Sequence, residues 1–212
     1  MARIAISGTG FIGRGLAMAL GRHSRLSVSR VLTRRSLGMV EHPCKDLLTD
    51  NRDVFLDGCD LVVECSGDVL HSAEVIHAAQ KRGLPVVTMN SEFHVTVGSA
   101  LVGEGYLTEA EGDQPGCLAA LDQRAREAGF SPLVYGNIKG FLDHNPSLDQ
   151  MQYWAQRQGI SLPQVTAFTD GSKVQIEQAF VANGLDAGIL APGMMGPESG
   201  DLDAAAFELA EH

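Results

Sequence analysis

The chain has 212 residues, of which 44% are hydrophobic and 20% are charged, and its formal net charge is −10. This composition indicates a folded protein with a substantial core. No apolar run approaches the length that spans a membrane, and the first residues do not form a secretory signal. The basic residues also lack the interleaved aromatic residues of a nucleic-acid surface. We therefore expect a cytoplasmic protein with neither a nucleic acid nor a membrane as partner.

The cysteines and arginines are distributed in an informative way. Four cysteines form no C-x-x-C pair and have no histidine at metal-ligand spacing: Cys44, Cys59, Cys65 and Cys117. We expect reduced thiols, no disulfide and no metal site. Residues 1–40 contain seven arginines and no acidic residue, which places positive potential at the start of the chain.

The opening stretch, residues 3–14, predicts a dinucleotide-binding turn. A β-prone run leads into Gly8, Gly10 and Gly13, which are spaced as G-x-G-x-x-G, and a helical run follows at residues 16–20. In this motif the first glycine permits a tight turn, the second a close approach to pyrophosphate, and the third close packing of helix on strand. The alternative is an ordinary glycine turn. The expected cofactor contacts are Gly8, Thr9, Gly10, Phe11, Ile12 and Gly13.

The end of the second predicted strand, residues 26–32, bears on the choice of cofactor. Thr33 follows Gly13 by 20 residues, about where a dinucleotide-binding fold places an acidic residue on the ribose 2′-hydroxyl. Arg34 and Arg35 stand there instead, and a guanidinium group suits a 2′-phosphate. We expect NADP, with NAD possible, and contacts from Thr33, Arg34 and Arg35. The alternative is that both arginines face solvent.

Further strands alternate with helices. Residues 61–65, 85–89, 106–110 and 133–135 are predicted strands, and helices are predicted near residues 69–83, 95–101 and 117–128. This β-α-β order is typical of a doubly wound parallel sheet, an α/β Rossmann-type fold. Because ligands collect at the carboxyl ends of such strands, Ser66, Gly67 and Asn90 are further expected cofactor contacts. Asp68 or Ser72 is expected to cap the helix that begins near residue 69.

The last third is less periodic and predicts a second, smaller α+β domain. We place the boundary at residue 140, giving a nucleotide-binding domain at 1–140 and a substrate or oligomerisation segment at 141–212. Helices are predicted at residues 148–158, 173–183 and 201–212, and a strand at 163–168.

Six short segments together resemble a known family. They are residues 8–13 (GTGFIG), 63–67 (VECSG), 86–90 (VVTMN), 110–116 (AEGDQPG), 136–140 (GNIKG) and 168–173 (FTDGSK). The chain resembles the homoserine dehydrogenase-like NAD(P)-dependent oxidoreductases, in the branch that usually carries a C-terminal SAF domain. The resemblance runs to about residue 196. It implies an enzyme of amino-acid metabolism that transfers a hydride between NADP(H) and a small polar alcohol or aldehyde, such as homoserine or aspartate semialdehyde.

Two departures from the family leave alternatives open. Ser91 occupies the position of an active-site lysine in homoserine dehydrogenases, and family members in this branch are about twice as long. One member type instead reduces and isomerises 1-deoxyxylulose 5-phosphate, so a sugar phosphate is an alternative substrate. A shortened, noncatalytic NADP-binding protein is a further alternative. A homodimer is possible.

Two residues are candidates for catalysis. Lys139 lies between Gly136 and Gly140, which leave the backbone room to approach a ligand, and a lysine can donate a proton to a developing alkoxide. Asp113 follows a predicted strand and could orient this lysine or bind substrate. The alternatives are a surface lysine and a helix N-cap.

Five residues are candidates for substrate binding: Glu92, Asn137, Asp170, Lys173 and Glu177. Lys173 and Glu177 are four apart and share one face of a predicted helix, where they could hold an anionic group and an amine, or form a solvent-exposed ion pair. Glu92 could instead favour the start of a helix. The histidines are assigned no role.

Overall fold

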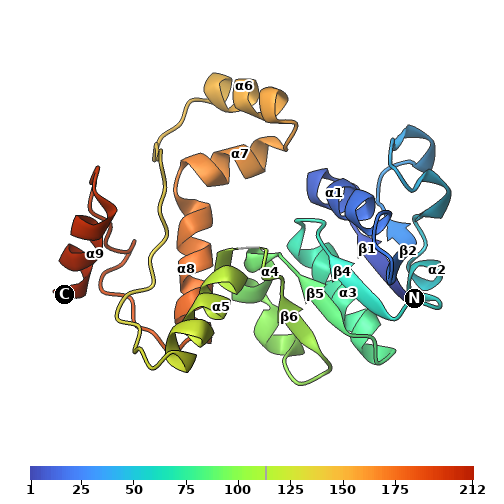
Figure 1. The fold of residues 1–212 in the computed structure, drawn as a ribbon. Helices are drawn as coiled ribbons and strands as arrows, with labels where there is room; N and C mark the ends of the chain where they lie inside the picture. Colours follow the sequence, from blue (N-terminus) through green and yellow to red (C-terminus); the bar gives the residue numbers. More distant parts are fainter. Residues whose placement is uncertain (113) are drawn as a thin grey trace. The chain divides into compact units, whose positions relative to one another are not determined.

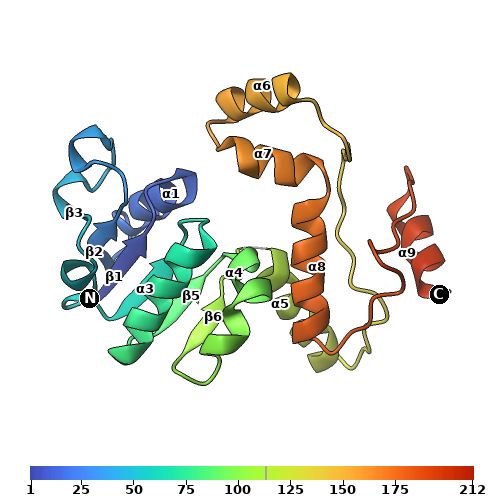
Figure 2. The ribbon, with the colours of Figure 1, turned by 180° about the vertical axis from the view of Figure 1, so that it is seen from behind.

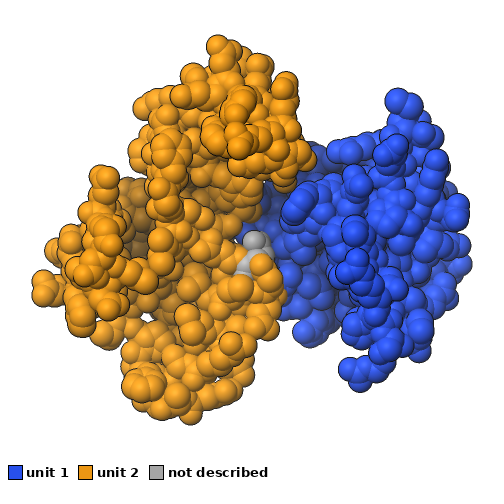
Figure 3. Space-filling view, turned by 45° about the horizontal axis from the view of Figure 1, so that its top comes forward, with its two compact units in different colours: residues 1–110 blue, residues 111–212 orange. Residues whose placement is uncertain are grey.

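The structure, a computed structural model, describes residues 1–112 and 114–212. The chain forms two compact units, residues 1–110 and 111–212, which are coloured separately in Figure 3. The expected domain boundary at residue 140 therefore lies inside the second unit. Within the described residues, no helix is long and apolar enough to cross a membrane.

Unit 1 is built on one parallel sheet with the strand order β3-β2-β1-β4-β5-β6. This is the strand order of a Rossmann fold, as the sequence predicted. β1 lies in the middle, paired with β2 on one side and β4 on the other. The strands are β1 (Ala2–Ser7), β2 (Leu26–Leu32), β3 (Leu48–Thr49), β4 (Leu61–Glu64), β5 (Val86–Thr88) and β6 (Leu107–Glu109).

Helices cover both faces of this sheet (Figures 1 and 2). Because side chains alternate along a strand, Ile4 and Ile6 pack on the face of α1, whereas Ala5 packs with α2, α3 and α4 on the other. Each face of the sheet is thus covered by a cluster of buried hydrophobic side chains. The helices of unit 1 are α1 (Phe11–Leu20), α2 (Arg52–Leu56), α3 (Val69–Lys81) and α4 (Ser91–Thr96), with short 3-10 turns η1 (Leu37–Met39), η2 (Lys45–Leu47) and η3 (Gly98–Leu101).

In unit 2, the regular elements of residues 114–212 are all helices: α5 (Gln114–Glu127), α6 (Leu148–Gln158), α7 (Leu162–Thr169), α8 (Ser172–Gly184) and α9 (Leu202–Ala210). α5 packs on α8, and α7 packs on both α6 and α8. The predicted helix at residues 148–158 is confirmed with the same bounds. Ser147 starts it by a capping box, in which its side chain and that of Gln150 bond each other's backbone N–H groups.

Several sequence predictions were wrong. Residues 133–135 form no strand. The sheet contains instead a strand that was not predicted, β3, which is only two residues long and therefore has no recognisable pattern. Residues 163–168 lie in α7 and not in a strand, because Ser161 and Gln164 form a second capping box and Pro163 stands in its first turn. The helix expected at residues 95–101 is divided between α4 and η3.

Candidate functional site

The glycine turn joins β1 to α1 at the carboxyl edge of the sheet. Gly8 has φ +121°, and a Cβ there would lie 2.9 Å from the carbonyl oxygen of Cys65. A Cβ on Gly13 would overlap the carbonyl oxygen of Gly8, so the first turn of α1 rests directly on the turn below it. At Gly10, by contrast, a Cβ would meet nothing within 4 Å. Two glycines therefore allow close packing, and the middle one leaves open space for a ligand.

The start of α1 suits an anion. Its N-cap is Gly10, which has no side chain to bond the first N–H groups, and its first turn contains no acidic residue. These N–H groups and the positive end of the helix dipole can therefore face a phosphate. Phe11 and Ile12 follow the turn and are exposed. The residues present thus fit the pyrophosphate of a dinucleotide.

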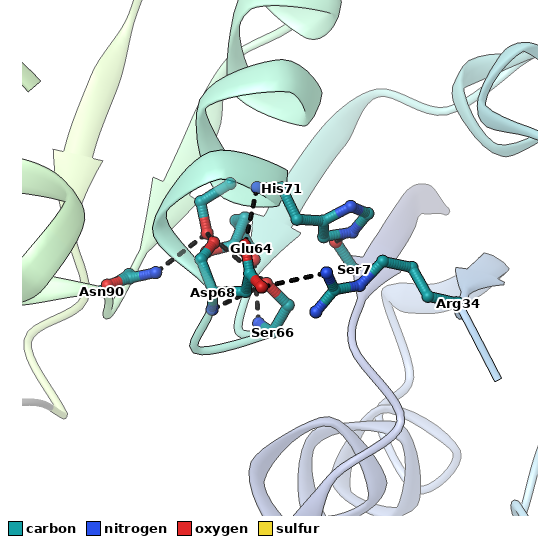
Figure 4. A network of polar contacts seen from close by, with 8 residues as sticks. Ser7, Arg34, Glu64, Ser66, Asp68, His71 and Asn90 are labelled. Carbon is teal, nitrogen blue, oxygen red and sulfur yellow. Dashed lines mark hydrogen bonds and ion pairs between the residues drawn. The ribbon is translucent and has the colours of Figure 1, made fainter. Parts of the chain in front are cut away.

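The ends of β2 and β4 meet this turn from either side. Thr33 follows β2, and its Oγ1 lies 3.1 Å from Oγ1 of Thr9, which fixes the turn against that strand. Arg34 reaches the other way, and its Nη1 lies 2.9 Å from Oδ2 of Asp68, beyond the end of β4 (Figure 4). The Arg35 side chain has no ion pair among the described residues, although its backbone N–H bonds Thr33.

A network of buried polar groups holds the ends of β4 and β5 together (Figure 4). Glu64 is fully buried, and its carboxylate accepts hydrogen bonds from the backbone N–H of Ser66 at 2.8 Å and from Oγ1 of Thr88 at 3.3 Å. Asn90 donates to Oγ of Ser72 at 2.9 Å. Its Oδ1 also accepts from the first turn of α4, so the Asn90 side chain serves as the cap of that helix.

Burial sets the protonation of two groups beside the turn. It lowers the pKa of His71, whose Nε2 lies 3.3 Å from Oγ of Ser7, so the ring stays neutral near pH 7. Burial likewise raises the pKa of the Cys65 thiol to about 12, and the protonated thiol donates to the carbonyl of Ser7 at 3.2 Å. The pKa of Asp68 is held low by the backbone N–H of His71 and by Arg34. Neither His71 nor Cys65 offers a charge here.

In unit 2, three predicted residues meet at one carboxylate. Glu177 of α8 is 4% exposed, and its oxygens lie 3.8 Å from Nζ of Lys139 and 3.9 Å from Nζ of Lys173. Asn137 donates to the same carboxylate at 3.4 Å, and Lys139 donates to Gln114 of α5 at 3.3 Å. We call Asn137, Lys139, Lys173 and Glu177 the lysine-glutamate cluster.

The other predicted residues are placed differently. Asp170 lies at the corner between α7 and α8, where its side chain accepts from the N–H of Ser172, and no contact with Glu177 is found among the described residues. Glu92 is half-buried in the first turn of α4. Gly67 follows β4 with φ +72°. Asp113 lies outside the described residues.

Two family models account for most of the chain. Residues 8–103 match the model "Homoserine dehydrogenase, NAD binding domain", and residues 112–211 match the model "Oxidoreductase DRL, catalytic domain". The first match contains the glycine turn and the strands around it, and the second contains the lysine-glutamate cluster. Each match covers just under half of the chain, and both are to oxidoreductases: the first half is similar to the NAD-binding domain of homoserine dehydrogenases, and the second to a separate oxidoreductase catalytic domain.

One solved structure supports the fold, and two others are similar to part of the chain. A protein from Archaeoglobus fulgidus described as "Putative Homoserine Dehydrogenase" is 18% identical, with a TM-score of 0.59 over 86% of this chain and 68% of its own. A homoserine dehydrogenase from Thiobacillus denitrificans is 22% identical, with a TM-score of 0.46 over 60% of this chain and 33% of its own. An NAD-binding protein from Listeria innocua is 16% identical, with a TM-score of 0.42 over 61% of this chain and 40% of its own. The chain therefore spans well under half of the last two. No curated protein matches the sequence.

Sequence reasoning missed several contacts in unit 1. Glu64 was part of a familiar segment but had no assigned role, and its position at the end of a buried strand was the available signal. Asp68 was predicted only as a helix cap, which it is, through a 2.9 Å bond from the N–H of His71. Its ion pair with Arg34 crosses between segments that are 34 residues apart, and no local pattern predicts it.

Proposed function

We propose that this protein is an NADP(H)-dependent oxidoreductase acting on a small, polar, anionic alcohol or carbonyl compound. Nicotinamide supplies the hydride chemistry, so the protein must bind the dinucleotide, hold the substrate and manage one proton. The glycine turn and the uncapped start of α1 support binding of the pyrophosphate. Ser66, Gly67 and Asn90 lie at the ends of the next strands, on the side where the fold places the nicotinamide half.

Two arginines support NADP over NAD. Arg34 and Arg35 follow β2, where NAD-binding proteins of this fold carry an acidic residue for the ribose hydroxyl. A 2′-phosphate bonds well to a guanidinium group, whereas an acidic residue would repel it. Arg34 forms an ion pair with Asp68, whereas the Arg35 side chain has no ion pair in the described part of the chain. Both arginines are proposed as contacts of the 2′-phosphate.

The lysine-glutamate cluster is the observation that carries the substrate proposal. Its two lysine side chains are of the type that binds a carboxylate or phosphate on a substrate. Oδ1 of Asn137 is buried without a hydrogen-bond partner among the described residues, so it can accept from a substrate hydroxyl or ammonium group. Lys139 is the proposed proton donor to the substrate oxygen, and Glu177 positions it. Lys173, Glu92 and Asp170 remain proposed substrate contacts, and Asp113 a proposed catalytic residue.

Two substrates are compatible with this cluster. Homoserine, or aspartate semialdehyde in reverse, carries a carboxylate for the lysines and an ammonium group for Glu177 or Asn137. A sugar phosphate such as 1-deoxyxylulose 5-phosphate carries a phosphate for both lysines. Residues 112–211 match an oxidoreductase catalytic domain whose description names no substrate, so homoserine or aspartate semialdehyde stays the first proposal and a sugar phosphate the second.

The test is a binding titration followed by turnover. NADPH and NADH are titrated into the purified protein, and oxidation of NADPH is then followed with each carbonyl substrate. We expect tighter binding of NADPH and turnover of one substrate. Lys139→Ala should lower kcat about 100-fold or more while leaving NADPH binding unchanged.

Lys45→Ala is a matched control, because Lys45 lies in η2 of unit 1 and belongs to neither site. It should leave kcat unchanged. A normal kcat in Lys139→Ala would remove this residue from the mechanism. Binding of NADPH without turnover of either substrate would instead support a noncatalytic dinucleotide-binding protein.

A further inference from the structure

The ion pair between Arg34 and Asp68 crosses the carboxyl end of β1, beside the glycine turn. Arg34 follows β2 and Asp68 follows β4, and β1 lies between these two strands. Neighbouring strands are about 4.8 Å apart, so the pair bridges roughly 10 Å across the carboxyl end of β1. The glycine turn begins at that end. Figure 4 shows the guanidinium directed toward Asp68 and the start of α3.

An Arg34 side chain that points to Asp68 is not placed to bind the 2′-phosphate of NADP(H). The adenosine ribose of a dinucleotide lies at the end of β2 in this fold, but the Arg34 guanidinium is held on the far side of β1 by a 2.9 Å contact with Asp68. The two side chains are 58% and 39% exposed, so the contact is accessible to solvent and to ligand. A doubly charged phosphate can displace a carboxylate from such an exposed pair.

We propose that Asp68 is a specificity-determining residue that competes with the 2′-phosphate of NADP(H) for Arg34. This inference rests on the proposed preference for NADP(H). Binding of NADP(H) exchanges the Asp68 carboxylate for the phosphate, whereas NAD(H) leaves the Arg34–Asp68 pair intact. Asp68 therefore reduces the preference that the two arginines create, and it does so without touching the cofactor.

Asp68→Asn tests this competition without removing the helix cap. Asparagine caps helices as well as aspartate does, so the bond to the N–H of His71 is retained while the charge is lost. We expect NADPH to bind about two- to fivefold more tightly and NADH to bind unchanged, as measured by the fluorescence of the reduced nicotinamide. Asp68→Ser, which also preserves a cap, should give the same result if the asparagine variant is poorly folded.

Two controls separate competition from other effects of charge. In an Arg34→Ala background, Asp68→Asn should have no effect, because the competed group is gone. Asp53→Asn removes the same charge from another exposed ion pair of unit 1, in which Oδ1 of Asp53 lies 2.6 Å from Nη2 of Arg82, and it should leave both affinities unchanged.

The outcomes distinguish this inference from the cofactor proposal. If Arg34→Ala weakens NADPH binding but Asp68→Asn leaves it unchanged or weakens it, the competition is refuted and the cofactor proposal stands. Tightening that persists without Arg34, or that Asp53→Asn reproduces, also refutes the competition. An Arg34→Ala variant with unchanged affinity for NADPH refutes the competition, and the cofactor proposal then rests on Arg35. A wild-type protein that binds neither dinucleotide refutes both.

Discussion

Gly13→Ala should destabilise unit 1 through one steric contact. The new Cβ would overlap the carbonyl oxygen of Gly8, and it would also lie 3.5 Å from Sγ of Cys65. Because the overlapped atom belongs to the backbone, no side chain can rotate away to relieve it. Either α1 must move off the sheet or the turn must change shape.

The magnitude follows from two opposing effects. Alanine is favoured over glycine inside a helix by about 1 kcal/mol. Overpacking at a rigid site costs about 1–3 kcal/mol, and a backbone clash lies at the upper end of this range or beyond it. We therefore expect a net loss of about 2 kcal/mol in the free energy of unfolding. That is a large part of the 5–15 kcal/mol that is typical of a domain.

Chemical denaturation, followed by circular dichroism, measures this loss. Gly15→Ala is the matched control, because it lies in the same helix and a Cβ there would meet nothing within 4 Å. It should raise the stability by about 0.5–1 kcal/mol. If Gly13→Ala were as stable as Gly15→Ala, α1 would not rest on the glycine turn as described.

Three further predictions concern the two sites. Gly10→Ala should leave the stability within about 0.5 kcal/mol of wild type but weaken NADPH binding about tenfold or more in a titration, because the methyl group would fill space meant for phosphate. The wild type should lose stability between pH 7.5 and pH 5.5, because the pKa of His71 is lowered in the folded protein and the unfolded chain therefore takes up the proton at a higher pH, about 6.5. His71→Gln should make this loss of stability smaller. Glu177→Gln should destabilise the protein by about 2–3 kcal/mol in urea, because Lys139 and Lys173 both lose their ion pair with the buried carboxylate; unchanged stability would refute this pairing.

Local signals made much of unit 1 predictable. The glycine spacing located the β1–α1 turn, and apolar runs located β4 and β5. Asp68 was one of two expected caps, because it stands directly before a helical pattern, and it is the one that caps α3. Such signals depend only on residues that are close in sequence. They fix the elements and, through the β-α-β order, the parallel sheet.

Contacts between distant segments were not predictable in this way. The approach of Lys139 to Glu177 depends on how a loop packs against α8, and no spacing encodes it. Residues 163–168 were misjudged because Val165 and Ala167 alternate with polar residues as in a strand, whereas the capping box at Ser161 starts a helix. Residues 133–135 are apolar enough for a strand but pair with none.

The central place of β1 has a kinetic consequence. Its amide hydrogens are bonded on both edges, to β2 and β4, so they exchange with deuterium from the solvent only when the sheet itself opens. We therefore expect β1, which leads into the glycine turn, to be among the slowest-exchanging strands of unit 1. A phosphate-binding loop on such a base keeps its shape before the ligand arrives, and little conformational entropy is lost there on binding.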